Sequence, residues 1–362
     1  MKQLLKKPFY KMIGFYYLFF SINAVCQTDL NVPLSLSLNQ IQILGSHNSY
    51  KRPIESALLE FISSKDPQQA QALNYYHPDL STQLTLGLRQ LEIDILKDSK
   101  GGVFVNPIGE TIAKKKLLTS SEKKDLAKPG FKVMHKPDID FMSHCILFDT
   151  CLTQLKQWSE QNPEHLPIFI LMNIKESATR IVEGQQPQTF LPKDFRQLDN
   201  ILKHAFQEKL FTPDKLRGHY TSLPQAIKQH GWPKLEKLKG SFIFILDASA
   251  EQINRYRGEN KNLNNLSLFV SVDEQDPGAA IFVINDPVNQ FYKIKHLVSS
   301  GFIVRTRSDA TIQDILEHNT KRAQAAIASG AQIISTDSYP NSPLSKQYHF
   351  TVSFKPNIWI NF

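Results

Sequence analysis

Short runs of strand-forming residues alternate with longer helical patterns along the chain, and this alternation restricts the fold more than any other feature. Each run is apolar or β-branched and ends at polar or turn-forming positions. The runs are residues 41–44, 90–95, 132–134, 168–172, 241–246, 268–272, 302–305 and 332–334, with 281–284 competing for the sixth place. Because strands that alternate with helices assemble into parallel sheets, eight of them predict an α/β chain closed as a single (β/α)₈ TIM barrel, regular or distorted.

Three of the intervening segments have a helical period. Residues 149–161 and 195–206 carry apolar side chains at helical spacing, and 311–329 is a third such segment, ending before Gly330, a typical C-terminal cap. The last stretch, 346–362, is rich in aromatic residues that alternate with polar ones. We expect it to form a strand or extended tail on the outside of the barrel.

The N-terminus has the pattern of a signal peptide. Four lysines accompany a mostly apolar run at 12–25, which is short for a membrane span. The sequence therefore predicts a signal peptide over 1–26, a barrel domain over 27–345 and a tail over 346–362. A lipoprotein acylated at Cys26 is the alternative. With either leader the protein is expected outside the cytoplasm, secreted or periplasmic, in peripheral contact with membranes.

The charge of the chain excludes one class of partner. The formal net charge is +8, and removing the N-terminal segment takes away four lysines and no acid, which leaves +4. A nucleic-acid-binding protein usually has a much more concentrated basic surface. We therefore expect no nucleic-acid partner, and no stable protein partner is evident.

Only Cys145 and Cys151 remain once Cys26 is removed. An even pair of cysteines in an exported protein predicts a disulfide. Two reduced thiols in the core are the alternative, and zinc has less support because no accompanying ligand spacing is present.

Polar side chains stand at or near the ends of most predicted strands. In a TIM barrel the C-terminal ends of the strands open onto one mouth, where active sites occur, so these residues should converge although they are far apart in the sequence. They are His47, Asn48, Glu92, Asp94, His135, Asn173, Lys175, Asp247, Arg305, Arg307 and Asp337.

Two carboxylates in the second predicted strand indicate a cation site. Glu92 and Asp94 are two residues apart, so strand alternation places both on one face of a buried strand. Unpaired buried carboxylates are costly, and a bound cation would remove that cost. Carboxylate and amide oxygens favour Ca²⁺ ahead of Mg²⁺. Lys175 and the two arginines offer a metal-free way to neutralise the same pair.

These segments resemble the catalytic blocks of the Ca²⁺-dependent phosphoinositide phospholipase C family of secreted, mostly microbial proteins. The resemblance covers roughly residues 40–340, and its combination of blocks is specific although each alone is weak. The blocks are 43–50, 91–95, 134–137, 151–158, 166–170, 218–223, 231–233, 244–247, 304–307 and 334–340.

The resemblance implies a TIM-barrel enzyme that cleaves a phosphoinositide lipid at a membrane surface into diacylglycerol and an inositol phosphate. By this resemblance His47 and His135 are the two catalytic histidines. Asn48, Glu92 and Asp94 correspond to the Ca²⁺ ligands, and Asn173 stands where the wider family usually has a third carboxylate. That replacement lowers the charge of the metal site. The residues expected to contact substrate are Lys175, Asp247, Arg305, Arg307 and Tyr339.

Two other functions remain open from the sequence. A glycerophosphodiester phosphodiesterase uses similar chemistry, but its first block normally reads His-Arg-Gly where this chain has His47-Asn48-Ser49. A non-catalytic barrel that binds lipid headgroups is the second alternative. The presence of both His47 and His135 favours an enzyme, since a binding module needs neither.

Overall fold

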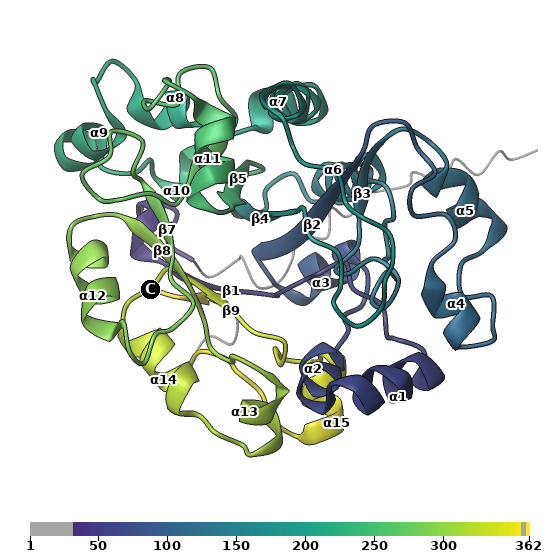
Figure 1. Cartoon of the computed structure of the whole chain (residues 1–362). Helices are drawn as coiled ribbons and strands as arrows, with labels where there is room; N and C mark the ends of the chain where they lie inside the picture. Colours follow the sequence, from purple (N-terminus) through teal and green to yellow (C-terminus); the bar gives the residue numbers. More distant parts are fainter. Residues whose placement is uncertain (1–31, 356–359) are drawn as a thin grey trace, which may run out of the picture.

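Eight parallel strands form a nearly closed barrel in the computed structural model, which describes residues 32–355 and 360–362 (Figure 1). The strand order around the sheet is β6-β5-β4-β2-β1-β9-β8-β7. One bridge, between Val270 and Ala279, links the two ends of this sheet. The predicted (β/α)₈ barrel is therefore confirmed. Its strands are β1 (Gln42–Gly45), β2 (Gln90–Asp98), β4 (Ile168–Lys175), β5 (Phe242–Asp247), β6 (Leu268–Val270), β7 (Ile281–Val283), β8 (Ile303–Arg307) and β9 (Ile333–Ser335).

One of the eight predicted strands does not belong to the barrel. The run at 132–134 lies in β3 (Gly130–Val133), which pairs antiparallel with β2 and lies outside the closed order. The competing run at 281–284 forms β7, so it and the run at 268–272 are both barrel strands. The number of strands was right and this assignment was wrong, because a short apolar run does not reveal the direction of its pairing.

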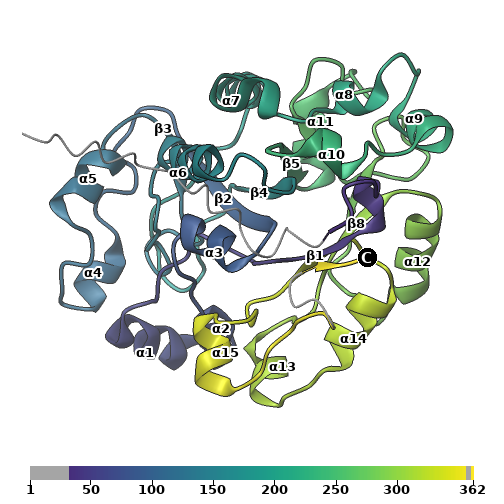
Figure 2. The ribbon, with the colours of Figure 1, turned by 180° about the vertical axis from the view of Figure 1, so that it is seen from behind.

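Helices surround the barrel and connect its strands (Figure 2). They are α1 (Ser56–Lys65), α2 (Pro67–Leu73), α3 (Leu80–Leu86), α4 (Ile108–Ile112), α5 (Ser120–Leu126), α6 (Phe148–Gln161), α7 (Pro192–Phe206), α8 (Pro213–Arg217), α9 (Leu223–His230), α10 (Leu235–Leu238), α11 (Ala250–Arg257), α12 (Phe291–Ser299), α13 (Ile312–Leu316), α14 (Lys321–Ala328) and α15 (Pro343–Tyr348). The helices predicted at 149–161 and 195–206 are confirmed as α6 and α7.

The helix predicted at 311–329 is two shorter helices. The first, α13, ends at Leu316, and α14 begins at Lys321. Between them His318 has a φ of 52°, a left-handed conformation that no α-helix contains. Apolar spacing alone did not reveal this break, because the apolar residues of both helices are buried in one hydrophobic cluster.

The barrel interior is tightly filled. All nine residues of β2 are buried, and so are five of the six residues of β5. Gly45, at the end of β1, lies so close to Gln90 that an added Cβ would come within 1.9 Å of the amide oxygen of that side chain. The first residues of the C-terminal stretch belong to α15, and strand β10 (Ile360–Asn361) pairs antiparallel with β1.

No helix within the described residues is both long and apolar enough to cross a membrane. The predicted signal peptide at 1–26 lies outside the described residues.

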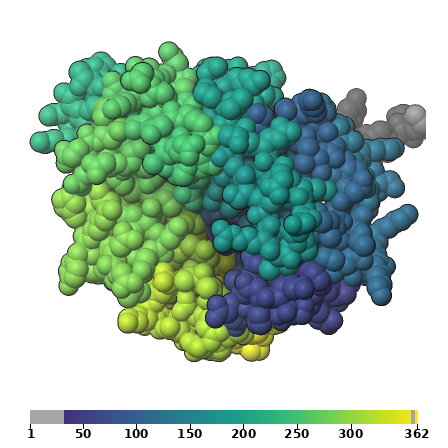
Figure 3. Space-filling model, viewed as in Figure 1, coloured from purple at the N-terminus to yellow at the C-terminus, as the bar shows by residue number. Residues whose placement is uncertain are grey.

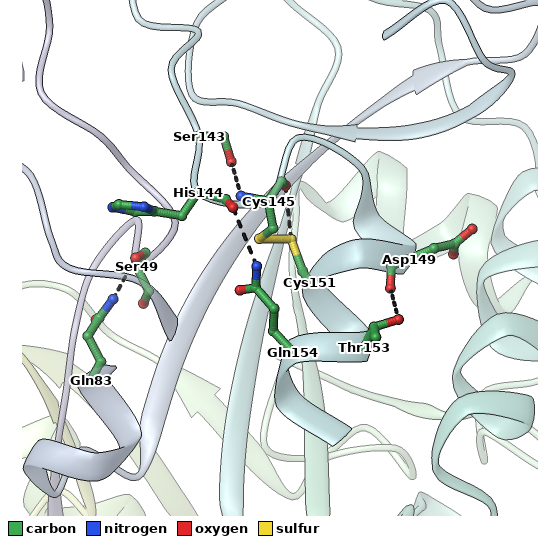
Figure 4. Close-up of a disulfide and its surroundings, with 9 residues drawn as sticks. All are labelled: Ser49, Gln83, Ser143, His144, Cys145, Asp149, Cys151, Thr153 and Gln154. Atoms are coloured by element: carbon green, nitrogen blue, oxygen red, sulfur yellow. Dashed lines mark hydrogen bonds between the residues drawn. A yellow bond between two sulfur atoms is a disulfide. The ribbon is translucent and has the colours of Figure 1, made fainter. Parts of the chain in front are cut away.

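A disulfide joins Cys145 to Cys151 and attaches the start of α6 to the segment after β3 (Figure 4). The predicted bond is thus confirmed and the alternative of two core thiols is wrong. Both residues are buried, and the amide of Gln154 on α6 donates to the carbonyl oxygen of His144 in the same region. The bond therefore fixes the segment that follows His135.

The double variant Cys145→Ser/Cys151→Ser tests this role. Closing so short a loop stabilises by only about 2 kcal/mol in the chain-entropy account, so the variant should still fold. We expect a modest fall in Tm. Relative to the wild-type protein, hydrogen exchange should become faster in the segment 135–147, with little change in the barrel strands. Uniform exchange throughout the barrel, or two titratable thiols in the native wild-type protein, would contradict this role.

Candidate active site

The predicted site residues meet at the C-terminal ends of the barrel strands. The register between neighbouring strands places Asp94 of β2 opposite Asn173 of β4, and Asn173 opposite Asp247 of β5. The molecular surface is hollowed near the centre of the face shown in Figure 3, beside the teal segment that follows β4. Side chains predicted from strand ends scattered along the sequence therefore share one mouth.

The first histidine, His47, follows β1 and lies between two carboxylates. Its Nδ1 is 3.5 Å from Oδ2 of Asp337, and its Nε2 is 3.8 Å from Oε1 of Glu92. The imidazole stacks on the ring of Tyr75, with 5.5 Å between the ring centroids. The next residue, Asn48, has a φ of 48°, a left-handed conformation that asparagine tolerates better than most residues. This turn holds both side chains at the barrel mouth.

Burial controls the protonation of His47. Desolvation lowers its pKa to about 4, and the nearby Arg307 guanidinium acts in the same direction. Glu92 and Asp337 oppose this shift without cancelling it. His47 is therefore a neutral imidazole at neutral pH, able to accept a proton, and Asp337 stands ready to stabilise the imidazolium that would form.

The second histidine, His135, reaches the mouth because β3 runs antiparallel to β2. Val133 pairs with Ile95, one residue beyond Asp94, so the chain leaving β3 heads back toward the barrel. His135 Nδ1 then lies 2.7 Å from Oδ2 of Asp140. Burial lowers the pKa of His135 to about 4, although the Asp140 carboxylate acts against that shift. This histidine also has a carboxylate partner of its own.

Asp140 is itself held by a buried lysine. Lys51 Nζ lies 2.8 Å from Oδ1 of Asp140, and both side chains are fully buried. The same ammonium donates to the carbonyl oxygen of Leu73. Burial would raise the pKa of Asp140, but Lys51 and His135 keep it below the usual value. Asp140 thus stays charged and orients His135.

The two carboxylates of β2 are each paired with a cation. Arg305 Nη2 donates to Oε2 of Glu92 over 2.7 Å, and Lys175 Nζ lies 3.0 Å from Oδ2 of Asp94. Burial raises the pKa of both acids, against the attraction of their positive partners. Asp247, at the end of β5, also has a pKa raised by burial.

The donor set fits a hard cation. Asn48 Oδ1 is buried and accepts no hydrogen bond from any described residue, while its amide donates to the hydroxyl of Tyr75. No three His, Cys, Asp or Glu side chains form a metal cluster within residues 32–355 and 360–362. An ion here would therefore rely on amide as well as carboxylate oxygens, as Ca²⁺ can. Lys175 and Arg305 pair with Asp94 and Glu92, which is the metal-free arrangement expected from the sequence.

The residues expected to contact substrate have different environments. Lys175 and Arg305 pair with the acids, Asp247 is half-buried at the mouth, and Arg307 lies 3.4 Å from both Asp309 and Asp337. Burial, with Asp337 close by, raises the pKa of Asp309 to about 6. The pair of acids around Arg307 therefore holds this guanidinium beside His47.

Tyr339 lies behind the site rather than at its surface. Its side chain is fully buried, its hydroxyl lies 3.2 Å from Nδ1 of His77, and the two rings stack. His77 Nε2 in turn lies 2.8 Å from the carbonyl oxygen of His47 and 3.4 Å from Oδ1 of Asp337. In this arrangement Tyr339 supports the His47–Asp337 pair through His77, and its contact with substrate stays a prediction.

Several supporting residues were missed in the sequence. Asp140 follows His135 by five positions and a turn brings it back, which an acid close behind a candidate histidine could have suggested. Lys51, Tyr75 and His77 precede the second strand, and no pattern in the sequence distinguishes them from ordinary loop residues.

Comparison with known proteins identifies the family. The sequence profile of the Ca²⁺-dependent phosphoinositide phospholipase C family matches residues 36–361. No curated protein sequence matches the chain significantly.

Solved structures share the fold at low sequence identity. A calcium-dependent phosphoinositol-specific phospholipase C from a Gram-negative Pseudomonas species matches with a TM-score of 0.55 and 19% identity, covering 94% of this chain and 99% of its own. A Ca²⁺-dependent phosphatidylinositol-specific phospholipase C from Streptomyces antibioticus matches with a TM-score of 0.53 and 16% identity, covering 83% and 94%.

The structural likeness supports the barrel, and the profile match spans nearly the whole described chain, with both histidines and all four candidate metal ligands inside it. The chain therefore belongs to the Ca²⁺-dependent phosphoinositide phospholipase C family.

Proposed function

We propose that this protein is exported and cleaves phosphatidylinositol-type lipids at a membrane surface into diacylglycerol and a cyclic inositol phosphate. The disulfide between Cys145 and Cys151 supports an oxidising compartment. One observation carries the proposed chemistry: two half-buried histidines, each beside its own carboxylate, lie at one barrel mouth with the ion pairs Lys175–Asp94 and Arg305–Glu92.

The two histidines have different roles in this reaction, one as the general base and the other as the general acid. His47 Nε2 takes the proton of the inositol 2-hydroxyl as its oxygen bonds to phosphorus, and Asp337 stabilises the resulting imidazolium. His135 gives a proton to the departing diacylglycerol oxygen as the second phosphorus–oxygen bond breaks. With a pKa of about 4 His135 is neutral at neutral pH, and the anionic phosphate of the substrate would raise that pKa so that His135 can carry the proton it donates.

Cations of the site hold the phosphate while this happens. Lys175 and Arg305 are within reach of Glu92 and Asp94 and can share their charge with a phosphate. Asn48, Glu92, Asp94 and Asn173 would hold Ca²⁺, which when bound polarises a phosphate oxygen and acidifies the attacking hydroxyl. Water can later open the cyclic product.

A product analysis tests this function directly. Purified protein should release diacylglycerol and a cyclic inositol phosphate from phosphatidylinositol, as followed by phosphorus NMR, and a chelator should stop the reaction. Glycerophosphoinositol should be a poor substrate. Preferred cleavage of glycerophosphoinositol would identify a glycerophosphodiester phosphodiesterase, and no cleavage of either compound under any metal condition would leave a binding module.

The role of His135 as the acid has a specific signature. His135→Ala should lower turnover of phosphatidylinositol by about 10²–10⁴-fold, because the leaving alkoxide then departs without a proton. An inositol phosphodiester with a nitrophenol leaving group needs no such proton, so His135→Ala should lose far less activity on that substrate. His47→Ala should be impaired with both substrates, and the exposed His204→Ala serves as the control. If His135→Ala loses the same fraction of its activity on both substrates, His135 is not the general acid.

The metal site predicts opposite effects for two substitutions. Asp94→Asn should weaken Ca²⁺ binding by roughly tenfold or more because a charged ligand is lost, whereas Asn173→Asp should strengthen it by adding one. Calorimetry or terbium luminescence measures this binding without turnover.

Glu160→Gln removes one negative charge from an exposed position on α6 and is the matched control. If Asp94→Asn binds Ca²⁺ as tightly as Glu160→Gln does, the carboxylates are neutralised by Lys175 and Arg305 alone.

A further inference from the structure

A basic pocket of about 710 Å³ opens next to the candidate active site. Its walls come from the segments that follow β1, β3 and β4, all of them at the mouth of the barrel. Lys65 at the end of α1, Lys136 in the turn after His135, and Arg180 in the segment after β4 contribute its cations. The teal segment after β4 lies against the purple α1–α2 region on the face shown in Figure 3.

The pocket adjoins the catalytic groups through the chain itself. Lys136 directly follows His135, and Ser177, another lining residue, is two positions beyond Lys175. The Lys175 ammonium is close enough to Lys136 to act on its pKa, against the opposite influence of Asp140 and Asp94, so an anion placed between the two ammonium groups would be attracted to both. A ligand in this pocket would therefore lie beside a substrate held at the mouth.

The walls of the pocket are connected to one another. Asp138, at the tip of the turn that carries Lys136, has a φ of 70° and accepts hydrogen bonds from the backbone amides of Gln185 and Ile108 over 2.7 and 2.9 Å. The backbones of Lys136 and Asp140 exchange two hydrogen bonds across the base of the same turn. The turn is thus attached to the segment after β4, and the pocket is built before any ligand arrives.

The charge of the pocket is not neutralised from within. Three cationic side chains face one carboxylate, Asp66, whose Oδ1 already accepts the backbone amide of Gln69 at the start of α2. Across the described residues, no carboxylate forms an ion pair with Lys65, Lys136 or Arg180, although many other lysines and arginines of this part of the chain are paired. Lys65 and Arg180 are exposed and Lys136 is half-buried.

We propose that this pocket binds the phosphate of a lipid headgroup at the membrane surface, beside the phosphodiester that the active site cleaves. Two lysines and one arginine around a cavity with serine and threonine in its wall form the kind of environment that phosphate groups prefer. The phosphate has two sources: a ring phosphate of a phosphorylated inositol headgroup, or the phosphate of a neighbouring anionic lipid. The inference rests on the proposed function, because it assumes that the barrel mouth faces a membrane.

The test variant is Lys65→Gln/Arg180→Gln. Both residues are exposed and make no ion pair with a described carboxylate, so the variant should fold with an unchanged Tm. Lys228→Gln/Arg196→Gln removes the same charge from exposed positions on α9 and α7 and is the matched control. Lys136 is kept, because it adjoins His135.

The first arm measures co-sedimentation with phosphatidylcholine vesicles that contain phosphatidylglycerol and no inositol lipid. Each cation near an anionic surface strengthens binding by about fivefold, so the test variant should lose roughly 25-fold and the control much less. The second arm compares inositol 1-phosphate with inositol 1,4-bisphosphate by calorimetry. Wild-type protein should prefer the bisphosphate if the pocket takes a ring phosphate, and the test variant should lose that preference.

Each result decides the proposal. A loss confined to the vesicle arm assigns the pocket to a neighbouring lipid, and a loss confined to the soluble arm assigns it to a ring phosphate. Equal behaviour of test and control variants in both arms overturns the proposal. Neither arm depends on turnover. If the wild-type protein does not cleave the lipid but the test variant still loses binding, the proposed function is refuted and the pocket proposal is kept. If the wild-type protein cleaves the lipid but the test variant binds as the control does, only the pocket proposal is refuted.

Discussion

Two negative charges buried on one strand are the constraint on which the rest of this site depends. Glu92 and Asp94 lie within a strand whose nine residues are all buried, and a buried carboxylate without a partner would cost several kcal/mol. Arg305 on β8 forms an ion pair with Glu92, and Lys175 on β4 forms one with Asp94. β4 is a direct neighbour of β2, whereas β1 and β9 separate β8 from β2, so it is the curvature of the barrel that brings Arg305 to Glu92. Removing either cation would leave a buried charge unpaired.

The same pairing neutralises Glu92 and Asp94 from within the protein, so a ligand that binds here has to exchange with these ion pairs. Lys175 and Arg305 would compete with a Ca²⁺ ion for these carboxylates, and a substrate phosphate would also attract both cations. A phosphate that draws the two cations away from Glu92 and Asp94 would leave these carboxylates unpaired, and unpaired carboxylates favour the binding of a metal ion. The four proposed ligands, Asn48, Glu92, Asp94 and Asn173, would offer a Ca²⁺ ion only two negative charges. Substrate and Ca²⁺ are therefore expected to bind cooperatively, each lowering the cost of the other.

The sequence revealed those parts of the site that depend on strand position and missed those that depend on chain direction. The ends of parallel strands must meet, so the strand pattern alone was enough to place His47, Glu92, Asp94 and Lys175 together. The antiparallel direction of β3 could not be read from a short apolar run, although it is what returns His135 to the mouth. The partner of His135, Asp140, and the lysine behind it depend on the turn that follows. Tyr339 belongs to a segment that was matched through the family resemblance, and a sequence motif does not tell that its side chain lies fully buried behind His77.

The turn after β3 connects catalysis to the surface of the molecule. One face of this turn carries His135 and Asp140 toward the active site, while Lys136 lines the basic pocket. Lys51 fixes the turn from below, Asp138 attaches its tip to the segment after β4, and the disulfide holds the chain where it enters α6. A phosphate bound by Lys136 would pull on the same short segment that positions His135. Because that segment is held at three points, such a contact can orient the enzyme at a membrane without displacing the histidine, which a free loop would not allow.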